Sequence, residues 1–139
     1  MTNSQAESEV RAVIAGHGDF AVGAISAVQQ ISGLGARLHP LSNAGLDAAA
    51  IDLALRALLD STGAAVVFTD LPAGSCTLAA RRVARERPGL VVVTGANIAM
   101  LLDFVFQDEA DAAAAAHAAE KGREAIIVAA PPPGVTRAG

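Results

Sequence analysis

The sequence has no tryptophan, no tyrosine and only four phenylalanines among its 139 residues. Basic side chains are also scarce, because ten lysines and arginines stand against 14 acids and give a net charge of −4. A nucleic-acid interface ordinarily combines a basic face with interleaved aromatic rings, so we expect no nucleic-acid binding. With 53% apolar residues and so few rings, the core must consist largely of alanine, valine, leucine and isoleucine.

Disulfides, membrane spans and metal-ligand clusters are missing as well. Cys76 is the only cysteine, which excludes a disulfide within the chain and favours a reducing, cytoplasmic location. No segment approaches the roughly 18 apolar residues that a membrane span needs, and the polar, acidic start is unlike a signal peptide. The three histidines and the cysteine show no metal-ligand spacing, so we expect no metal and no other cofactor.

Apolar runs that alternate with helical patterns predict a single α/β domain over residues 10–130. Such alternation is typical of a doubly wound, mostly parallel sheet with helices on both faces. We expect strands at 10–15, 36–41, 64–69, 90–94 and 125–129, and helices at 20–32, 47–61, 75–87, 98–106 and 109–121. The strands at 64–69 and 90–94 read as buried on both faces, whereas Pro40 indicates an edge strand. Residues 1–9 are expected to be disordered and the proline-rich 131–139 to form a flexible tail.

The most informative turn is Gly16-His17-Gly18, which lies between the first strand and a helix that starts near Phe20. It places the histidine at the carboxyl edge of the sheet, where ligands bind in open α/β folds. Glycine lets the backbone turn sharply, and the start of a helix offers amide groups to an anion such as phosphate. A loop histidine without a role is the alternative.

Two further strand-to-helix turns, 70–75 and 95–97, reach the same edge and carry an aspartate, a serine and an asparagine. A histidine that accepts phosphate needs its other nitrogen held as N–H by an acceptor, and Asp70 is well placed for this role. Its alternative is a loop cap. Ser75 is expected to cap the third helix and, with Gly18 and Gly74, to bind the phosphoryl oxygens.

The remaining polar candidates receive structural interpretations. Asp19 is expected to cap the first helix, and His39 and His117 to be structural or surface residues. Cys76 lies at a helix start, which can lower a thiol pKa, but we interpret it as a small packing residue. Four arginines on the third helix predict a solvated face rather than a docking patch, with Arg82 and Glu86 spaced to pair: Arg81, Arg82, Arg85 and Arg87.

Four segments resemble motifs of the IIA domain of the mannose-type sugar phosphotransferase system. They are the turn 16–18, the stretch Thr69-Asp70-Leu71-Pro72-Ala73-Gly74-Ser75-Cys76, the stretch Gly95-Ala96-Asn97-Ile98-Ala99-Met100-Leu101-Leu102, and Gly122-Arg123-Glu124-Ala125-Ile126. They lie in order over about residues 11–128. The chain is most similar to the branch that serves N-acetylgalactosamine or galactosamine.

The resemblance implies a phosphohistidine carrier. His17 would accept phosphate from the histidine phosphocarrier protein and pass it to an EIIB domain, with Asp70 orienting the ring and membrane contact only through transporter components. The family pattern is altered at Pro72, Ala73 and Cys76, which favours the alternative of a regulatory module whose phosphorylation state is read by another protein. A small-ligand domain stays open. The fold alone also leaves open the phosphoryl-donor subunit of dihydroxyacetone kinase, but the turn Gly16-His17-Gly18 argues against it, since the turn in that family resembles Ser-His-Ser.

The resemblance also implies a particular assembly. Family members have a four-stranded parallel sheet and a fifth, antiparallel strand supplied by the partner in a homodimer. Residues 125–129 would be that exchanged strand here. From the sequence alone, the strand pairs equally well within its own chain.

Overall fold

The computed structural model describes residues 9–130 and residue 133. The expected disordered segment 1–9 and proline-rich tail 131–139 lie outside these residues, apart from Glu9 and Pro133. The elements follow in the order β1 (Ala12–Gly16), α1 (Phe20–Ser32), a 3₁₀ turn (Gly35–Arg37), β2 (Leu38–Ser42), α2 (Ala48–Thr62), β3 (Val66–Thr69), α3 (Ser75–Glu86), β4 (Val91–Val93), α4 (Ile98–Phe106) and α5 (Asp111–Glu124). No helix in this part of the chain is long and apolar enough to cross a membrane.

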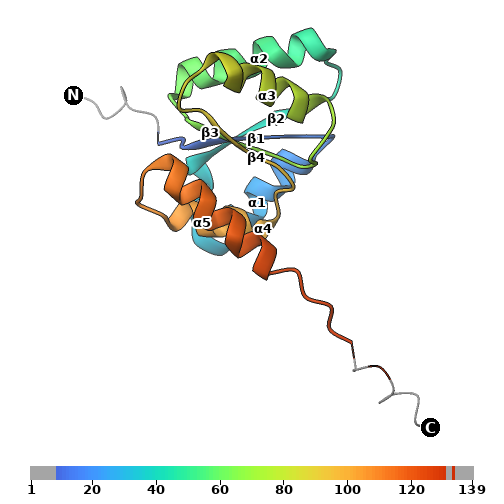
Figure 1. Cartoon of the computed structure of the whole chain (residues 1–139), viewed down its shortest axis with the longest axis vertical. Helices are drawn as coiled ribbons and strands as arrows, with labels where there is room; N and C mark the ends of the chain where they lie inside the picture. The colour runs from blue at the N-terminus through green and yellow to red at the C-terminus, as the bar shows by residue number, and fades with distance from the viewer. Residues whose placement is uncertain (1–8, 131–132, 134–139) are drawn as a thin grey trace.

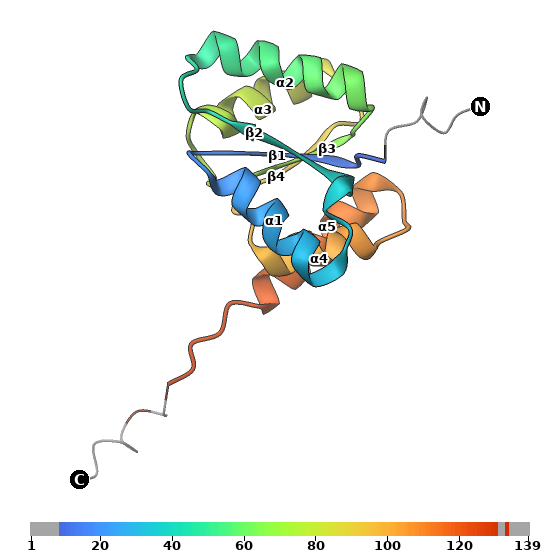
Figure 2. The ribbon, with the colours of Figure 1, turned by 180° about the vertical axis from the view of Figure 1, so that it is seen from behind.

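The strands form one parallel sheet in the order β2-β1-β3-β4, which confirms the predicted α/β fold with four parallel strands. Helices α2 and α3 cover one face, and α1, α4 and α5 cover the other (Figures 1 and 2). Pro40 lies in β2, which is an edge strand as predicted. The two central strands pair with Ala15 opposite Thr69, so the residues that follow them meet at the carboxyl edge.

Each face of the sheet has its own apolar core. Ile14 and Phe68 point to the side of α1, α4 and α5, where the rings of Phe68 and Phe104 meet edge to face with centroids 5.0 Å apart. Val13 and Val67 point to the side of α2 and α3. Most other core residues are small or aliphatic, as the scarcity of aromatic residues required.

The helix ends show which capping predictions hold. Asp47 accepts a hydrogen bond from the Ala50 amide at 2.8 Å and caps α2 as expected. Asp19 occupies the N-cap position of α1, but its side chain makes no capping bond. The prediction that Ser75 caps α3 is wrong, because the N-cap is Gly74 and Ser75 is the first helical residue. The backbone of Gly74 has φ 117°, a conformation that glycine adopts at little cost.

The C-terminal third differs from expectation in two respects. The strand expected at 90–94 is shorter, and its residues are only half buried because β4 forms the second edge of the sheet. Within the described residues, 125–130 form no strand; α5 continues to Glu124, and the apolar side chains beyond it are exposed, among them Ile126, Ile127 and Val128. The exchanged fifth strand stays a prediction about the dimer.

Candidate functional site

The turn that carries His17 is shaped by the glycines on either side. A Cβ atom on Gly16 would lie 2.7 Å from Phe20 Cδ2 and 3.1 Å from Asp70 Oδ2, so no larger residue fits there without displacing both side chains. Gly18 has a positive φ of 52°, which turns the chain toward α1. His17 therefore projects from the sheet edge with 48% of its side chain exposed.

Asp70 holds both the backbone and the ring of His17. Its Oδ2 atom accepts the His17 backbone N–H at 2.9 Å and lies 2.8 Å from ring Nδ1. A carboxylate can only accept, so Nδ1 carries a hydrogen and, in the neutral ring, Nε2 carries the lone pair. Burial of Asp70 acts to raise its pKa, but the hydrogen bonds from the His17 ring and backbone outweigh it and leave the pKa below its usual value.

The free side of the imidazole faces the start of α3. A Cβ atom on Gly74 would lie 3.3 Å from His17 Cε1 and 3.9 Å from Nε2, so the bare backbone of this glycine stands against that edge of the ring. The next residues, from Ser75 on, form the first turn of α3, whose amide groups have no partner within the helix and favour an anion. The lone pair of Nε2 thus lies near a surface suited to phosphoryl oxygens.

Two buried threonines fix the loop between β3 and α3. The Thr77 hydroxyl donates to Thr69 Oγ1 at 2.7 Å, and the Thr69 hydroxyl donates to the carbonyl oxygen of Leu71 at 3.2 Å. Both threonines are fully buried. This chain of bonds ties the residue after Asp70 to the first turn of α3, and so it holds the acid and the helix start in one arrangement.

The last residue of β2 and the one that follows it also support the turn, and the sequence interpretation missed them. The side-chain Oδ1 of Asn43 accepts the Gly18 backbone N–H at 3.3 Å, and the backbone N–H of Asn43 donates to the Gly16 carbonyl oxygen at 3.1 Å. The Ser42 hydroxyl donates to the Gly18 carbonyl at 2.8 Å. The signal was available, because a polar pair directly follows a strand that ends at the same edge.

Other polar residues from the sequence analysis lie elsewhere or have structural contacts. Asn97 caps α4 through Met100 N at 2.9 Å and donates Nδ2 to the Gly122 carbonyl at 3.0 Å, so it ties α4 to α5 rather than contacting His17. Cys76 is buried beneath the site, where burial and the nearby charge of Asp70 raise its pKa, in keeping with a packing role.

The other two histidines form no part of the site. His39 Nδ1 lies 3.0 Å from the Pro40 carbonyl, and His117 Nδ1 lies 2.7 Å from Asp103 Oδ2, between α4 and α5. Among the residues that the structure describes, no three histidines, cysteines, aspartates or glutamates are grouped so as to hold a metal ion.

Comparison with known proteins agrees with this architecture. Residues 11–121 match the EIIA-man family, described as "PTS system fructose IIA component". No curated protein sequence matches the chain. The fold is similar to the mannose/sorbose specific IIA subunit from Enterococcus faecalis, with a TM-score of 0.77, 22% identity, and coverage of 88% of this chain and 96% of that one.

Two further solved structures share the fold. The phosphotransferase system component EIIA from Streptococcus agalactiae has a TM-score of 0.76 at 21% identity, covering 86% of this chain and 96% of that one. The IIA protein associated with the fucose utilization operon of Streptococcus pneumoniae has a TM-score of 0.71 at 22% identity, covering 88% and 95%. Since the family match spans most of the described domain, the chain belongs to the EIIA-man family of sugar phosphotransferase system IIA components.

Proposed function

We propose that this protein carries a phosphoryl group on His17 Nε2, accepting it from the histidine phosphocarrier protein and passing it to an EIIB domain. The observation that carries the proposal is the pairing of His17 Nδ1 with Asp70 at 2.8 Å, because it leaves Nε2 as the nucleophile of a half-exposed ring. Family membership supports the same role.

The transfer needs one bond to form and one to break. The Nε2 lone pair of His17 attacks the phosphorus of the donor's phosphohistidine, and the donor imidazole leaves with the electrons of its N–P bond. His17 then carries Nδ1–H and Nε2–P, so its ring is cationic, and the Asp70 carboxylate offsets that charge. Transfer to EIIB reverses these roles, with His17 as the leaving group.

Backbone amides supply the anion-binding part of the mechanism. The first turn of α3 begins at Ser75, next to the Nε2 edge of His17, and its dipole favours the phosphoryl oxygens. Gly74 keeps that space free of a side chain, Gly18 adds no side chain to the turn beside His17, and the Ser75 hydroxyl is a further donor. Together these groups perform the phosphate-binding role assigned to Gly18, Gly74 and Ser75.

The same proposal includes a homodimer that exchanges its last segment. A groove of about 380 Å³ runs beside β4, and its lining includes Val91, Val92, Val93, Met100 and Ile126. The strand edge at β4 has no further strand beside it in the described chain, and the side chains of Ile126, Ile127 and Val128 are mostly exposed. Pairing of this segment with β4 of a second copy buries both surfaces.

A regulatory module is the second candidate, and the altered loop beside the histidine favours it. Pro72 and Ala73 are exposed in that loop, where a partner must approach His17. In that case His17 still accepts phosphate, but no EIIB domain removes it. A genome neighbourhood without membrane IIC and IID components supports this candidate, and rapid transfer to an EIIB domain contradicts it.

The deciding experiment is incubation with the general phosphotransferase enzyme, the phosphocarrier protein and phosphoenolpyruvate, followed by intact mass measurement. We expect the mass of one acid-labile phosphate on the wild-type chain and none on His17→Ala. The variants His39→Ala and His117→Ala serve as controls and gain the phosphate normally. A phosphate that persists in His17→Ala contradicts the proposal, and an unmodified wild type favours a small-ligand domain.

A further inference from the structure

We propose that Asn43 is a positioning residue for phosphoryl transfer: it fixes the backbone beside His17 so that ring Nε2 keeps facing the start of α3. Asp70 sets which ring nitrogen carries the hydrogen, whereas the bonds of Asn43 to this turn go to its main chain. The inference rests on the proposed function, because it concerns a further residue that the same transfer requires.

The backbone of the His17 turn is held from two sides. On the β3 side, the His17 N–H donates to Asp70 Oδ2 at 2.9 Å. On the β2 side, Asn43 Oδ1 accepts the Gly18 N–H at 3.3 Å, and the Ser42 hydroxyl donates to the Gly18 carbonyl oxygen at 2.8 Å. Both polar groups of the Gly18 main chain are therefore bonded to side chains from the end of β2.

Gly18 depends on these bonds because it has no side chain that could fix it. Glycine has the widest conformational freedom of any residue, and an added Cβ atom would meet no other part of the protein within 4 Å. A change in the Gly18 φ of 52° swings the turn, and with it the imidazole of the preceding residue. Asp70 restrains that motion from one side only, through the N–H and ring of His17.

The loop that carries Asn43 is itself held by hydrogen bonds. The Asn43 N–H donates to the Gly16 carbonyl oxygen at 3.1 Å, which continues the parallel pairing one step beyond the registered pair Gly16 and Ser42. The Asn43 carbonyl oxygen accepts the Leu46 N–H at 3.0 Å and closes a turn. Helix α2 begins directly afterwards, with Asp47 as its N-cap. A short, internally bonded loop thus connects Asn43 to α2.

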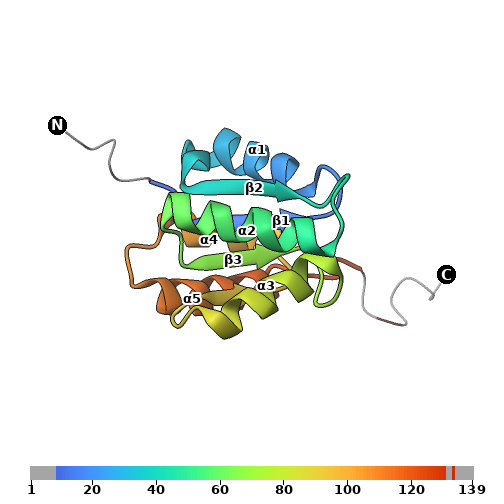
Figure 3. The same ribbon diagram turned by 90° about the horizontal axis from the view of Figure 1, so that it is seen from above.

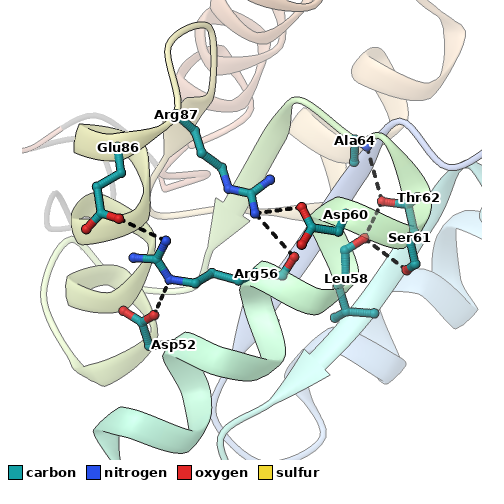
Figure 4. Close-up of polar contacts among 9 residues, drawn as sticks. All are labelled: Asp52, Arg56, Leu58, Asp60, Ser61, Thr62, Ala64, Glu86 and Arg87. Atoms are coloured by element: carbon teal, nitrogen blue, oxygen red, sulfur yellow. Dashed lines mark hydrogen bonds and ion pairs between the residues drawn. The ribbon is translucent and has the colours of Figure 1, made fainter.

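Ion pairs connect α2 in turn to α3, the helix that faces Nε2. Figure 4 shows Glu86 and Arg87 of α3 turned toward α2. The pair expected between Arg82 and Glu86 is replaced by bridges to α2. Three arginine–acid pairs join the two helices: Arg82 with Asp52 at 3.4 Å, Arg56 with Glu86 at 3.1 Å and Arg87 with Asp60 at 2.7 Å. Asn43 therefore ties the backbone of the His17 turn to the same layer whose first α3 turn faces the ring.

Transfer depends on this relation between the ring and α3. The lone pair of His17 Nε2 has to meet the phosphorus in line while the amides of α3 bind the phosphoryl oxygens. A displacement of about 1 Å can lower such a rate by about 10²-fold. Loss of the bond to Gly18 frees the turn without removing the Asp70 contact, so the tautomer survives and the alignment does not. The consequence is slower transfer with unchanged binding of the donor.

The test measures phosphorylation of the full chain by the phosphorylated histidine phosphocarrier protein, with rapid quench at increasing donor concentration. We expect Asn43→Ala and Ser42→Ala each to lower kcat about five-fold or more, with KM within about two-fold of the wild type. Asn43→Asp keeps an oxygen that accepts the Gly18 N–H, and it restores most of kcat when salt screens its charge.

Nuclear magnetic resonance gives a second readout that does not require transfer. The order parameter of the Gly18 N–H is expected to fall from about 0.85 to about 0.6 or below in Asn43→Ala, and to stay high in Asn43→Asp. The nitrogen shifts of the His17 ring stay those of the Nδ1–H tautomer in both variants, because Asp70 is untouched. A change of tautomer assigns the slow transfer to Asp70 and overturns the inference.

Gln29→Ala is the matched control, because Gln29 Oε1 accepts the Gly35 N–H at 2.8 Å after the far end of α1. This variant removes the same kind of bond away from the site, and we expect a normal kcat. An equal fall in the control overturns the inference and leaves the proposed function intact. So does an unchanged kcat in both Asn43→Ala and Ser42→Ala, or an Asn43→Asp variant that restores the order of Gly18 but not kcat. A wild type that takes no phosphate refutes the proposed function, while the order parameters still decide whether Asn43 holds the turn.

Discussion

Ala15 of β1 and Thr69 of β3 are paired in register, and the residues two positions and one position further on are His17 and Asp70. The register of the two central strands thus places the imidazole next to the carboxylate, and the turn residues leave the ring exposed. Each residue directly follows a fully buried strand, so a rigid part of the fold positions both side chains.

Replacing the carboxylate tests whether Asp70 orients His17. Asp70→Asn keeps the size of the side chain but loses its charge, so it no longer fixes the hydrogen on Nδ1 or stabilises the cationic ring. We expect phosphate uptake to slow by about 10²-fold or more while the fold is kept. Rapid-quench measurement of phosphorylation gives the rate. Asp19→Asn is the control, because Asp19 makes no capping bond; equal rates for the two variants contradict the prediction.

A methyl group at Gly74 tests the space beside Nε2. Gly74→Ala places a Cβ 3.3 Å from His17 Cε1 and also strains a backbone whose φ is 117°. Gly63→Ala is the matched control, since φ there is 74° and no atom lies within 4 Å of the added Cβ. We expect both variants to lose about 1 kcal/mol in denaturant unfolding and only Gly74→Ala to slow phosphate uptake. Slow uptake in both assigns the effect to lost stability.

Acid should remove the stabilising effect of the Asp70 pairing. The pKa of Asp70 in the folded protein lies below its ordinary value of 3.8, so its contribution is complete above that value and is lost as pH falls through the lower folded pKa. Urea unfolding of the wild type and of Asp70→Asn therefore gives a difference in unfolding free energy near pH 7 that shrinks below about pH 3.8. A difference that grows in acid contradicts the assigned direction.

A charge in the C-terminal segment tests strand exchange without disturbing the single chain. Ile127 is 77% exposed, so Ile127→Asp costs little within one chain but places a carboxylate in the proposed dimer interface. We expect light scattering at micromolar concentration to show a dimer for the wild type and a monomer for Ile127→Asp. Leu53→Asp on α2 is the control and stays dimeric. A monomeric wild type refutes the exchanged dimer.

The element order was predictable because each strand and helix carries its own local signal. β3 is a continuous run of β-branched and apolar residues, and Pro40 excludes β2 from the sheet interior. The half-buried state of β4 was not predictable, because a short run of valines looks the same in sequence whether its strand lies inside a sheet or at the edge.

At the site, chemistry-bearing residues were easier to predict than those that support them. His17 and Asp70 stand out as a histidine and an acid at strand ends, and the structure places them in contact. Asn43 and Thr77 act through hydrogen bonds to backbone or to another hydroxyl, and such bonds depend on which loops become neighbours. Ser75 resembled an N-cap by residue type. In the structure the N-cap is Gly74, whose positive φ of 117° favours glycine, and α3 begins at Ser75.

The hydrogen bond from Asn97 to the Gly122 carbonyl holds the end of α5 at the edge of the sheet where the strands finish. The described chain therefore enters beside the start of β1 and leaves from the opposite side, as Figure 3 shows. The position of the two ends matters when the protein is immobilised or fused to a tag. Attachment at the amino-terminal side leaves the sheet edge that carries His17 accessible to large molecules. A bulky fusion after residue 130 lies on the same side as that edge and restricts access to it.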